Sequence, residues 1–233
     1  MSEIETLDPV AAYALWAATY PPHAHNPLMQ AEERAMLALL GDLHGCMVID
    51  AGCGSGRYLT HVHQRGARGM LGVDLSAEML AKAALTLGEQ RSAGDAHARL
   101  LRGSLDALPI RDGWADVTIC GLTIGHLADL RAPLAELRRV TRRGGRLLCS
   151  DFHPIGHALG WRREFRAGDQ RFAVRHTPHL YSHWQHACTT LGLRIVRVLE
   201  PFLDQADIPA DAVFDPQALA VPVAIVFELR RER

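Results

Sequence analysis

The chain lacks the compositional marks of several protein classes. Its 233 residues include 25 Lys and Arg against 26 Asp and Glu, so the formal net charge is −1 and no basic footprint for nucleic acid is visible. No apolar run approaches the roughly 20 residues that a membrane-spanning helix requires. The first residues show no basic segment followed by an apolar one, so a secretory signal is not expected. We therefore expect a cytoplasmic protein with no membrane span and no nucleic-acid partner.

Cysteine and histidine also lack the spacings of metal or disulfide sites. The five cysteines are scattered without a C-x-x-C pair, which is typical of a reduced chain. His179, His183 and His186 do not form H-E-x-x-H and enclose no acidic residue, so no metal is expected. The length allows one domain with an appendage, or two small ones, and leaves a monomer and a homodimer equally open.

The most informative feature that is present is a glycine loop after an apolar run. Asp50 ends the run, and Gly52, Gly54 and Gly56 follow, which suits a sharp turn that a ligand approaches closely. This G-x-G-x-G spacing differs from the dinucleotide fingerprint G-x-G-x-x-G, and the Walker ending Gly-Lys-Ser/Thr is absent. A second apolar run ends in Asp74, which is placed to accept hydrogen bonds from two ribose hydroxyls. Together they predict a nucleoside-containing ligand across the carboxyl ends of two adjacent parallel strands.

Apolar runs and helical patterns alternate between residues 46 and 151, which predicts an α/β fold with a parallel sheet. A further helix and two strands follow, joined by a Pro- and Asp-rich loop over 200–220. The expected strands are near 46–51, 69–74, 99–102, 115–120, 145–151, 193–199 and 221–229. The expected helices are near 7–20, 27–41, 56–65, 76–88, 130–141 and 183–191.

Two segments fall outside this alternation. Residues 1–45 read as an N-terminal helical cap, and residues 152–182 are rich in His and Arg with a hairpin turn at Gly168-Asp169. We expect residues 152–182 to be a lid that is inserted after the fifth strand and covers the substrate. The nucleoside-binding domain is then formed by residues 46–151 and 183–233.

Further motifs make the family resemblance specific. The segments Gly103-Ser104-Leu105-Asp106-Ala107-Leu108-Pro109, Trp114–Leu122, His126-Leu127-Ala128-Asp129 and Leu134–Gly145 add to the glycine loop and Asp74. Together they resemble the class I (Rossmann-like) S-adenosylmethionine (SAM) methyltransferase superfamily, and in particular its small-molecule members of the UbiE/BioC-like group. The resemblance covers residues 46–151 well and the termini loosely. It implies a doubly wound, seven-stranded, mostly parallel sheet of order 3-2-1-4-5-7-6, with strand 7 antiparallel.

The resemblance also implies the cofactor SAM and the product S-adenosylhomocysteine (SAH). Ser104 stands where the family usually has an acid near the adenine, so adenine binding would rest on Ser104 and the Leu105 amide. His126 matches a histidine that is usually structural. Tyr20 either faces the sulfonium or belongs to the apolar stripe of its helix. The implied cofactor residues are Tyr20, Asp50, Gly52, Cys53, Gly54, Gly56, Asp74, Leu75, Ser104, Leu105, Cys120, Gly121 and His126.

The acceptor site is expected between the N-terminal helix and the lid. Alternation along the fifth strand puts Asp151 and His153 on one side, so His153 is the first candidate for a base, with His176 or His179 next. The arginines of the lid either bind a carboxylate or phosphate or form a solvated surface. The expected substrate-binding residues are Tyr13, Trp16, Asp151 and Arg175.

The function that follows is methylation of a small molecule at O or N, with an acidic metabolite as one option. The alternatives are C-methylation of a quinone-like or other aromatic acceptor, and SAM binding without turnover. Amine methylation of nucleic-acid bases uses Asn/Asp-Pro-Pro-Tyr/Phe after the fourth strand in the family, but this chain has Cys120-Gly121-Leu122-Thr123 there.

Overall fold

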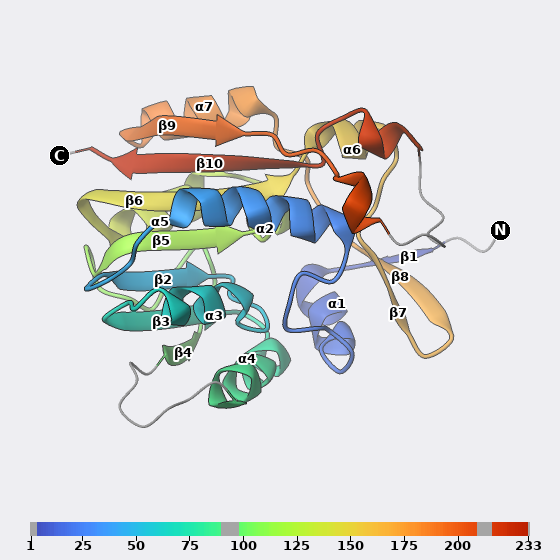
Figure 1. Ribbon diagram of the computed structural model, residues 1–233, viewed down its shortest axis with the longest axis horizontal. Helices are drawn as coiled ribbons and strands as arrows, with labels where there is room; N and C mark the ends of the chain where they lie inside the picture. Colours follow the sequence, from blue (N-terminus) through green and yellow to red (C-terminus); the bar gives the residue numbers. More distant parts are fainter. Residues whose placement is uncertain (1–3, 90–97, 209–215, 233) are drawn as a thin grey trace.

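A seven-stranded sheet dominates the computed structural model, which describes residues 4–89, 98–208 and 216–232 (Figure 1). The strands are β2 (Met47–Ala51), β3 (Gly69–Asp74), β4 (Ala98–Arg102), β5 (Ala115–Gly121), β6 (Thr141–Phe152), β9 (Leu193–Leu199) and β10 (Ala224–Arg231). They lie in the order β4-β3-β2-β5-β6-β10-β9, with β10 antiparallel to both of its neighbours. Numbered in chain order, this is 3-2-1-4-5-7-6, so the predicted topology is confirmed.

Helices cover both faces of this sheet. On one face lie α2 (Pro27–Leu40), α3 (Arg57–Gln64) and α4 (Ala77–Glu89), and on the other α5 (Arg131–Val140) and α7 (Tyr181–Thr190). Strand alternation assigns each apolar side chain to one layer. Val48 packs with Leu59 of α3, whereas its neighbour Ile49 packs with Leu134 of α5 and Trp184 of α7.

Local signals set the ends of the helices near the site. Asn26 caps α2, because its side chain accepts a hydrogen bond from the Met29 amide at 2.9 Å, and Pro27 is the first helical residue, as predicted. Gly56 precedes α3 with φ +87°, so the glycine loop runs directly into that helix. None of the helices in the described ranges is both long enough and apolar enough to cross a bilayer.

A second, three-stranded sheet lies beyond the carboxyl ends of the main strands (Figure 1). It has the order β1-β8-β7, with β1 (Glu5–Leu7) parallel to β8 (Gln170–Val174) and β7 (Glu164–Ala167) antiparallel to β8. The predicted hairpin turn at Gly168-Asp169 is confirmed. Helix α1 (Pro9–Trp16) packs against the hairpin, so the start of the chain and residues 164–174 form one layer.

Several boundaries differ from the sequence prediction. The first helix ends at Trp16 and not at residue 20, and the fifth strand begins at Thr141, which pairs with Ala115 before a register shift. The short strand β1 and helix α6 (Pro154–Ala158) had no periodic signal. The single-turn helices are η1 (Ile124–His126), η2 (Gln205–Asp207) and η3 (Pro216–Leu219). Residues 209–215 of the expected loop lie outside the described ranges.

Candidate functional site

A cavity of about 360 Å³ opens at the carboxyl ends of β2, β3 and β5. That volume is within the range of small-molecule sites. It brings together many of the residues expected from the sequence: Tyr13, Tyr20, Gly52, Cys53, Gly54, Asp74, Leu75, Ser104, Leu105, Gly121, His126 and Arg175. The other expected residues lie off its wall: Trp16, Asp50, Gly56, Cys120, Asp151, His153, His176 and His179.

The glycine loop forms the cavity wall with its backbone. The amides of Gly52 and Cys53 donate to the Val73 carbonyl oxygen at 2.7 and 2.9 Å, which ties the loop to β3. Gly52 has φ +79°, and a Cβ there would lie 2.3 Å from Cγ2 of Thr123. Gly54 also has a positive φ, of +53°. No larger residue fits at position 52, and the bare backbone leaves room for a ligand.

Asp74 ends β3 and faces the cavity next to this loop. Its Oδ2 accepts a hydrogen bond from the Gly54 amide at 2.8 Å, and its Oδ1 accepts one from the Ser76 amide at 2.9 Å. Burial raises the pKa of this carboxyl. Each oxygen keeps lone-pair capacity, so the carboxylate both holds the loop and can accept two hydroxyl donors from a ligand.

Asp50 lies behind the loop in a different setting. The residue is 1% exposed, and neither carboxyl oxygen has a hydrogen-bond partner. Burial raises its pKa to about 7, with repulsion from Asp74 and Glu32 adding to the effect and Arg57 opposing it. An unpaired buried carboxyl is costly, and a nearby cationic ligand would offset that cost.

A mostly apolar slot continues the cavity past Asp74. Leu75, Leu105 and Leu108 line it, together with the Ser104 hydroxyl. Gly103 is tightly packed here: a Cβ would lie 2.5 Å from Cδ of Pro109, so no larger residue fits. Ser104 is the polar side chain of this slot.

Tyr13 and His126 form a half-buried pair on the opposite wall. The Tyr13 Oη and His126 Nε2 are 2.9 Å apart, and His126 Nδ1 is 3.2 Å from the Arg175 carbonyl oxygen. A carbonyl oxygen only accepts, so Nδ1 carries the proton and Nε2 accepts from Tyr13. Burial, followed by the charge of Arg163, lowers the pKa of His126 to about 3, and burial raises the pKa of Tyr13. Both groups are therefore neutral at physiological pH.

Trp16 supports this wall from behind. Its ring stacks on Phe165 of β7 at 4.8 Å and on Tyr13 at 6.0 Å, and it meets Tyr20 edge-on at 4.9 Å. It thus belongs to the apolar contact between α1 and the hairpin and not to the cavity lining.

His153, the first candidate for a base, lies at the end of β6 and caps α6. Its Nδ1 accepts from the Ile155 amide at 3.3 Å, so its Nε2 is the donor to Glu200 Oε1 at 3.2 Å. Both ring nitrogens are occupied, and the residue lines a second cavity.

The other two candidate histidines are also held by partners. His176 Nε2 lies 2.9 Å from Oδ1 of the buried Asp151, and His179 Nε2 lies 3.0 Å from the Leu127 carbonyl oxygen. The assignment of a base to His153, His176 or His179 stays a prediction. Within the described ranges, no three His, Cys, Asp or Glu side chains are grouped to hold a metal ion.

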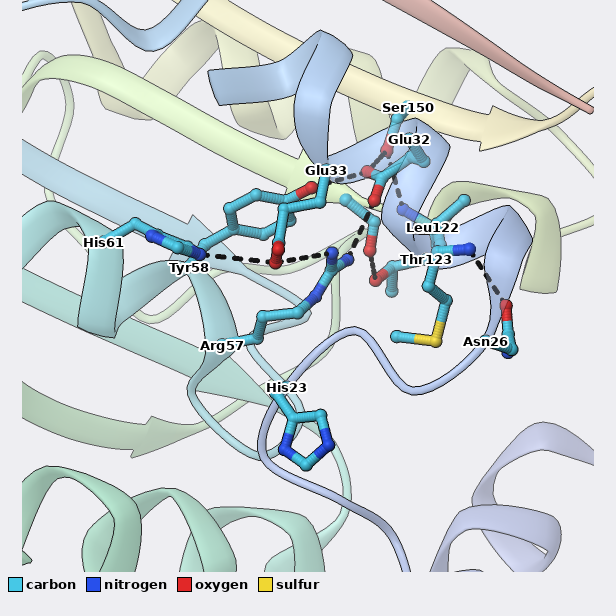
Figure 2. Close-up of polar contacts among 12 residues, drawn as sticks. His23, Asn26, Glu32, Glu33, Arg57, Tyr58, His61, Leu122, Thr123 and Ser150 are labelled. Carbon is cyan, nitrogen blue, oxygen red and sulfur yellow. Dashed lines mark hydrogen bonds and ion pairs between the residues drawn. The ribbon is translucent and has the colours of Figure 1, made fainter. Parts of the chain in front are cut away.

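A polar network under the site was missed by the sequence analysis. Glu32 of α2 is fully buried and accepts from Tyr58 Oη at 2.6 Å, from Arg57 Nη2 at 3.0 Å, and from the Ser150 hydroxyl (Figure 2). Arg57 also pairs with Glu33 at 3.2 Å. The available signal was the position of Glu32 three residues after Met29, on the apolar face of the helix. The network ties α2 to the start of α3 and to β6.

The chain is similar to known methyltransferases. A family model described as a methyltransferase domain matches residues 49–149. A malonyl-[acyl-carrier protein] O-methyltransferase from Hamiltonella defensa is 35% identical over 159 residues, which cover 66% of this chain and 55% of that protein. A demethylmenaquinone methyltransferase from Lactococcus lactis is 32% identical over 118 residues, or 49% of this chain and 46% of that protein.

The solved structures agree in fold. The S-adenosylmethionine dependent methyltransferase from Mesorhizobium loti superposes with a TM-score of 0.68 at 24% identity, covering 86% of this chain and 98% of that chain. The present chain spans about half the length of the curated relatives it matches.

Proposed function

We propose that this chain, which is similar to S-adenosylmethionine-dependent methyltransferases, methylates a carboxylate oxygen of a small acidic acceptor. One observation carries the proposal: a single cavity joins the glycine loop and Asp74 to a wall of Tyr13, His126 and Arg163. The part of the cavity beside the glycine loop and Asp74 suits a nucleoside-containing cofactor. The part beside the wall of Tyr13, His126 and Arg163 suits an acceptor. The products would be a methyl ester and SAH.

The residues around the loop fit SAM. Asp74 would accept hydrogen bonds from the ribose hydroxyls, the bare backbone at Gly52 and Gly54 would admit the ligand, and Leu75 and Leu105 would enclose the adenine. The unpaired carboxyl of Asp50 would offset positive charge near the loop. When bound, SAM supplies an electrophilic methyl group on a sulfonium.

The acceptor wall favours a nucleophile that needs no base. Among the described lining residues of the main cavity, His126 is the only histidine, and its low pKa makes it a poor base. A carboxylic acid is already ionised at neutral pH. The chain then has to orient the carboxylate and exclude water, which the aromatic layer of α1 and the hairpin can do. Relatives named malonyl-[acyl-carrier protein] O-methyltransferases support this acceptor class.

The test is a methyl-transfer assay with SAM labelled on the methyl group. The acceptors are a malonyl thioester, its monomethyl ester and an acetyl thioester, and the products are identified by mass. We expect SAH and a methyl ester only with the malonyl thioester, because it alone of the three carries a free carboxylate. Methylation of the acetyl thioester at an equal rate, or transfer to none of a wider set of carboxylic acids, would refute the proposal.

A second candidate is C-methylation of a quinone-like acceptor, which the demethylmenaquinone methyltransferase relative favours. Tyr13 and Tyr20 offer aromatic edges to such a ring. The same assay with a demethylmenaquinone analogue distinguishes the two. SAM binding without transfer to either acceptor class would indicate the non-catalytic alternative.

A further inference from the structure

Arg163 is a half-buried cation without an acidic partner among the described residues. Its Nη2 donates to Tyr20 Oη at 2.9 Å, while its Nε is buried and has no hydrogen-bond partner. No carboxylate within the described ranges lies at ion-pair distance from it, whereas Arg171 pairs with Glu164 in the same hairpin. A guanidinium held in this way keeps unused donors and a charge that the protein does not neutralise.

Aromatic rings surround this guanidinium. Its Cζ lies 5.3 Å from the ring centres of Trp16 and Phe152 and 5.7 Å from that of Tyr13. Ring faces attract the cation weakly, but they present no strong acceptor to Nε. An anion arriving here therefore meets charged donors that no carboxylate of the described residues occupies.

The position of Arg163 connects two cavities. The second cavity, of about 290 Å³, lies between the end of β6 and the segment that leads into the hairpin. No Asp or Glu is among its described lining residues. Its cationic or titratable lining consists of His153, His157, Arg162, Arg163, Arg175 and His176, and of these Arg163 and Arg175 also line the main cavity. An anion is therefore drawn toward the point where the two cavities meet.

We propose that Arg163 binds a carboxylate of the methyl acceptor, which reaches the main cavity through the second one. The inference rests on the function proposed above and assigns its anion-binding residue. A planar guanidinium fork matches a carboxylate in two parallel hydrogen bonds. The neighbouring Arg175 already pairs with Asp8, so Arg163 is the residue that offers its charge to the acceptor carboxylate.

Binding of malonate measures this site without requiring turnover. Calorimetric titrations compare malonate with neutral malonamide, with and without SAH, on wild type, Arg163→Met and Arg163→Lys. We expect Arg163→Met to weaken malonate binding roughly 10- to 100-fold, the loss for charge-assisted hydrogen bonds. The lysine variant should bind with intermediate affinity, and malonamide should not bind.

The matched control is Arg166→Met, which removes an exposed arginine three residues further along the chain. It should leave malonate binding unchanged. Unfolding temperature and SAH affinity check that each variant is folded. Equal malonate binding by wild type and Arg163→Met would overturn the proposal, as would a wild type that does not bind malonate.

Measurements of SAH affinity and of methyl transfer distinguish a failure of this inference from a failure of the proposed function. If Arg163→Met loses SAH binding to the same extent as malonate binding, Arg163 contacts the cofactor and the inference fails. If wild type binds malonate through Arg163 but transfers no methyl group, the anion site stands and the proposed function fails.

Discussion

Asp50 carries an electrostatic cost that the fold leaves uncompensated. Its pKa is raised to about 7, against an ordinary value near 3.9, so ionising it costs more in the folded state than in the unfolded one. The stability lost through this group therefore grows from about pH 4 to pH 7. We expect Asp50→Asn to match wild type near pH 4 and to be more stable at pH 8, by on the order of 2–4 kcal/mol. Urea unfolding at both pH values measures the difference.

The same substitution should weaken SAM binding at pH 8, because an anion near the loop is lost. A variant that is less stable than wild type at pH 8 would contradict the assigned cost of burial. Unchanged SAM affinity would show that Asp50 has no influence on the ligand.

Single residues differ in how far the sequence reveals them. The positions of Gly52 and Asp74 at the ends of β2 and β3 were predictable, because the motif is local and its spacing fixes the backbone. Arg163 was not, because it is one of several arginines in its segment and only the fold puts aromatic rings around it. Glu32 lies early in α2, yet it accepts from three side chains inside the protein.

Among the elements, α2 is joined to the sheet through Glu32. Removing this carboxylate leaves Tyr58 and Ser150 without their acceptor and Arg57 with Glu33 alone. We expect Glu32→Ala to lower the free energy of unfolding by about 3–5 kcal/mol, the cost of breaking a buried pair. Glu33→Ala is the matched control and should cost about 1 kcal/mol, because its carboxylate is partly exposed. Equal losses in urea unfolding would mean that the network does not depend on Glu32.

The hairpin β7–β8 packs on α1 and, in the function proposed above, would cover the acceptor. Replacing residues 164–174 with a short Gly/Ser linker removes Phe165 and Phe172 from the packing of α1 but leaves the glycine loop and Asp74 in place. We expect SAH affinity to stay largely intact. Methyl transfer should be abolished, because water then enters the part of the cavity proposed for the acceptor. Asp169→Ser at the hairpin tip should behave as wild type. Transfer at an unchanged rate by the linker variant would refute the role of this segment as a lid.

Elements with strong periodicity were predictable, and short paired ones were not. The strand bounds of β3 and β9 match the predicted 69–74 and 193–199, because apolar runs bounded by turns mark them. Strand β1 has three residues and pairs with β8 more than 160 positions along the chain, so no local pattern announces it. Its pairing joins the N-terminal cap to the inserted segment.

Across the whole molecule, the sheet order came from the family resemblance, since periodicity alone does not order strands. The topology places two acidic residues from adjacent strands, Asp50 and Asp74, around one loop. Asp74 accepts from that loop's Gly54 amide, whereas dinucleotide-binding folds leave such amides to a pyrophosphate. The two carboxylates beside the loop therefore disfavour a ligand with a pyrophosphate there and favour a cationic ligand.

The whole chain should accordingly be stabilised by SAH and not by NAD. A ligand that binds only the folded state adds about 2.7 kcal/mol at a concentration 100 times its Kd. For a domain of this size, that corresponds to an unfolding temperature roughly 5–10 °C higher. Asp74→Ala should reduce the SAH shift, because the carboxylate that would accept the ribose hydroxyls is lost. Thermal unfolding with each ligand tests this. A shift with NAD and none with SAH would show that the loop binds a pyrophosphate after all.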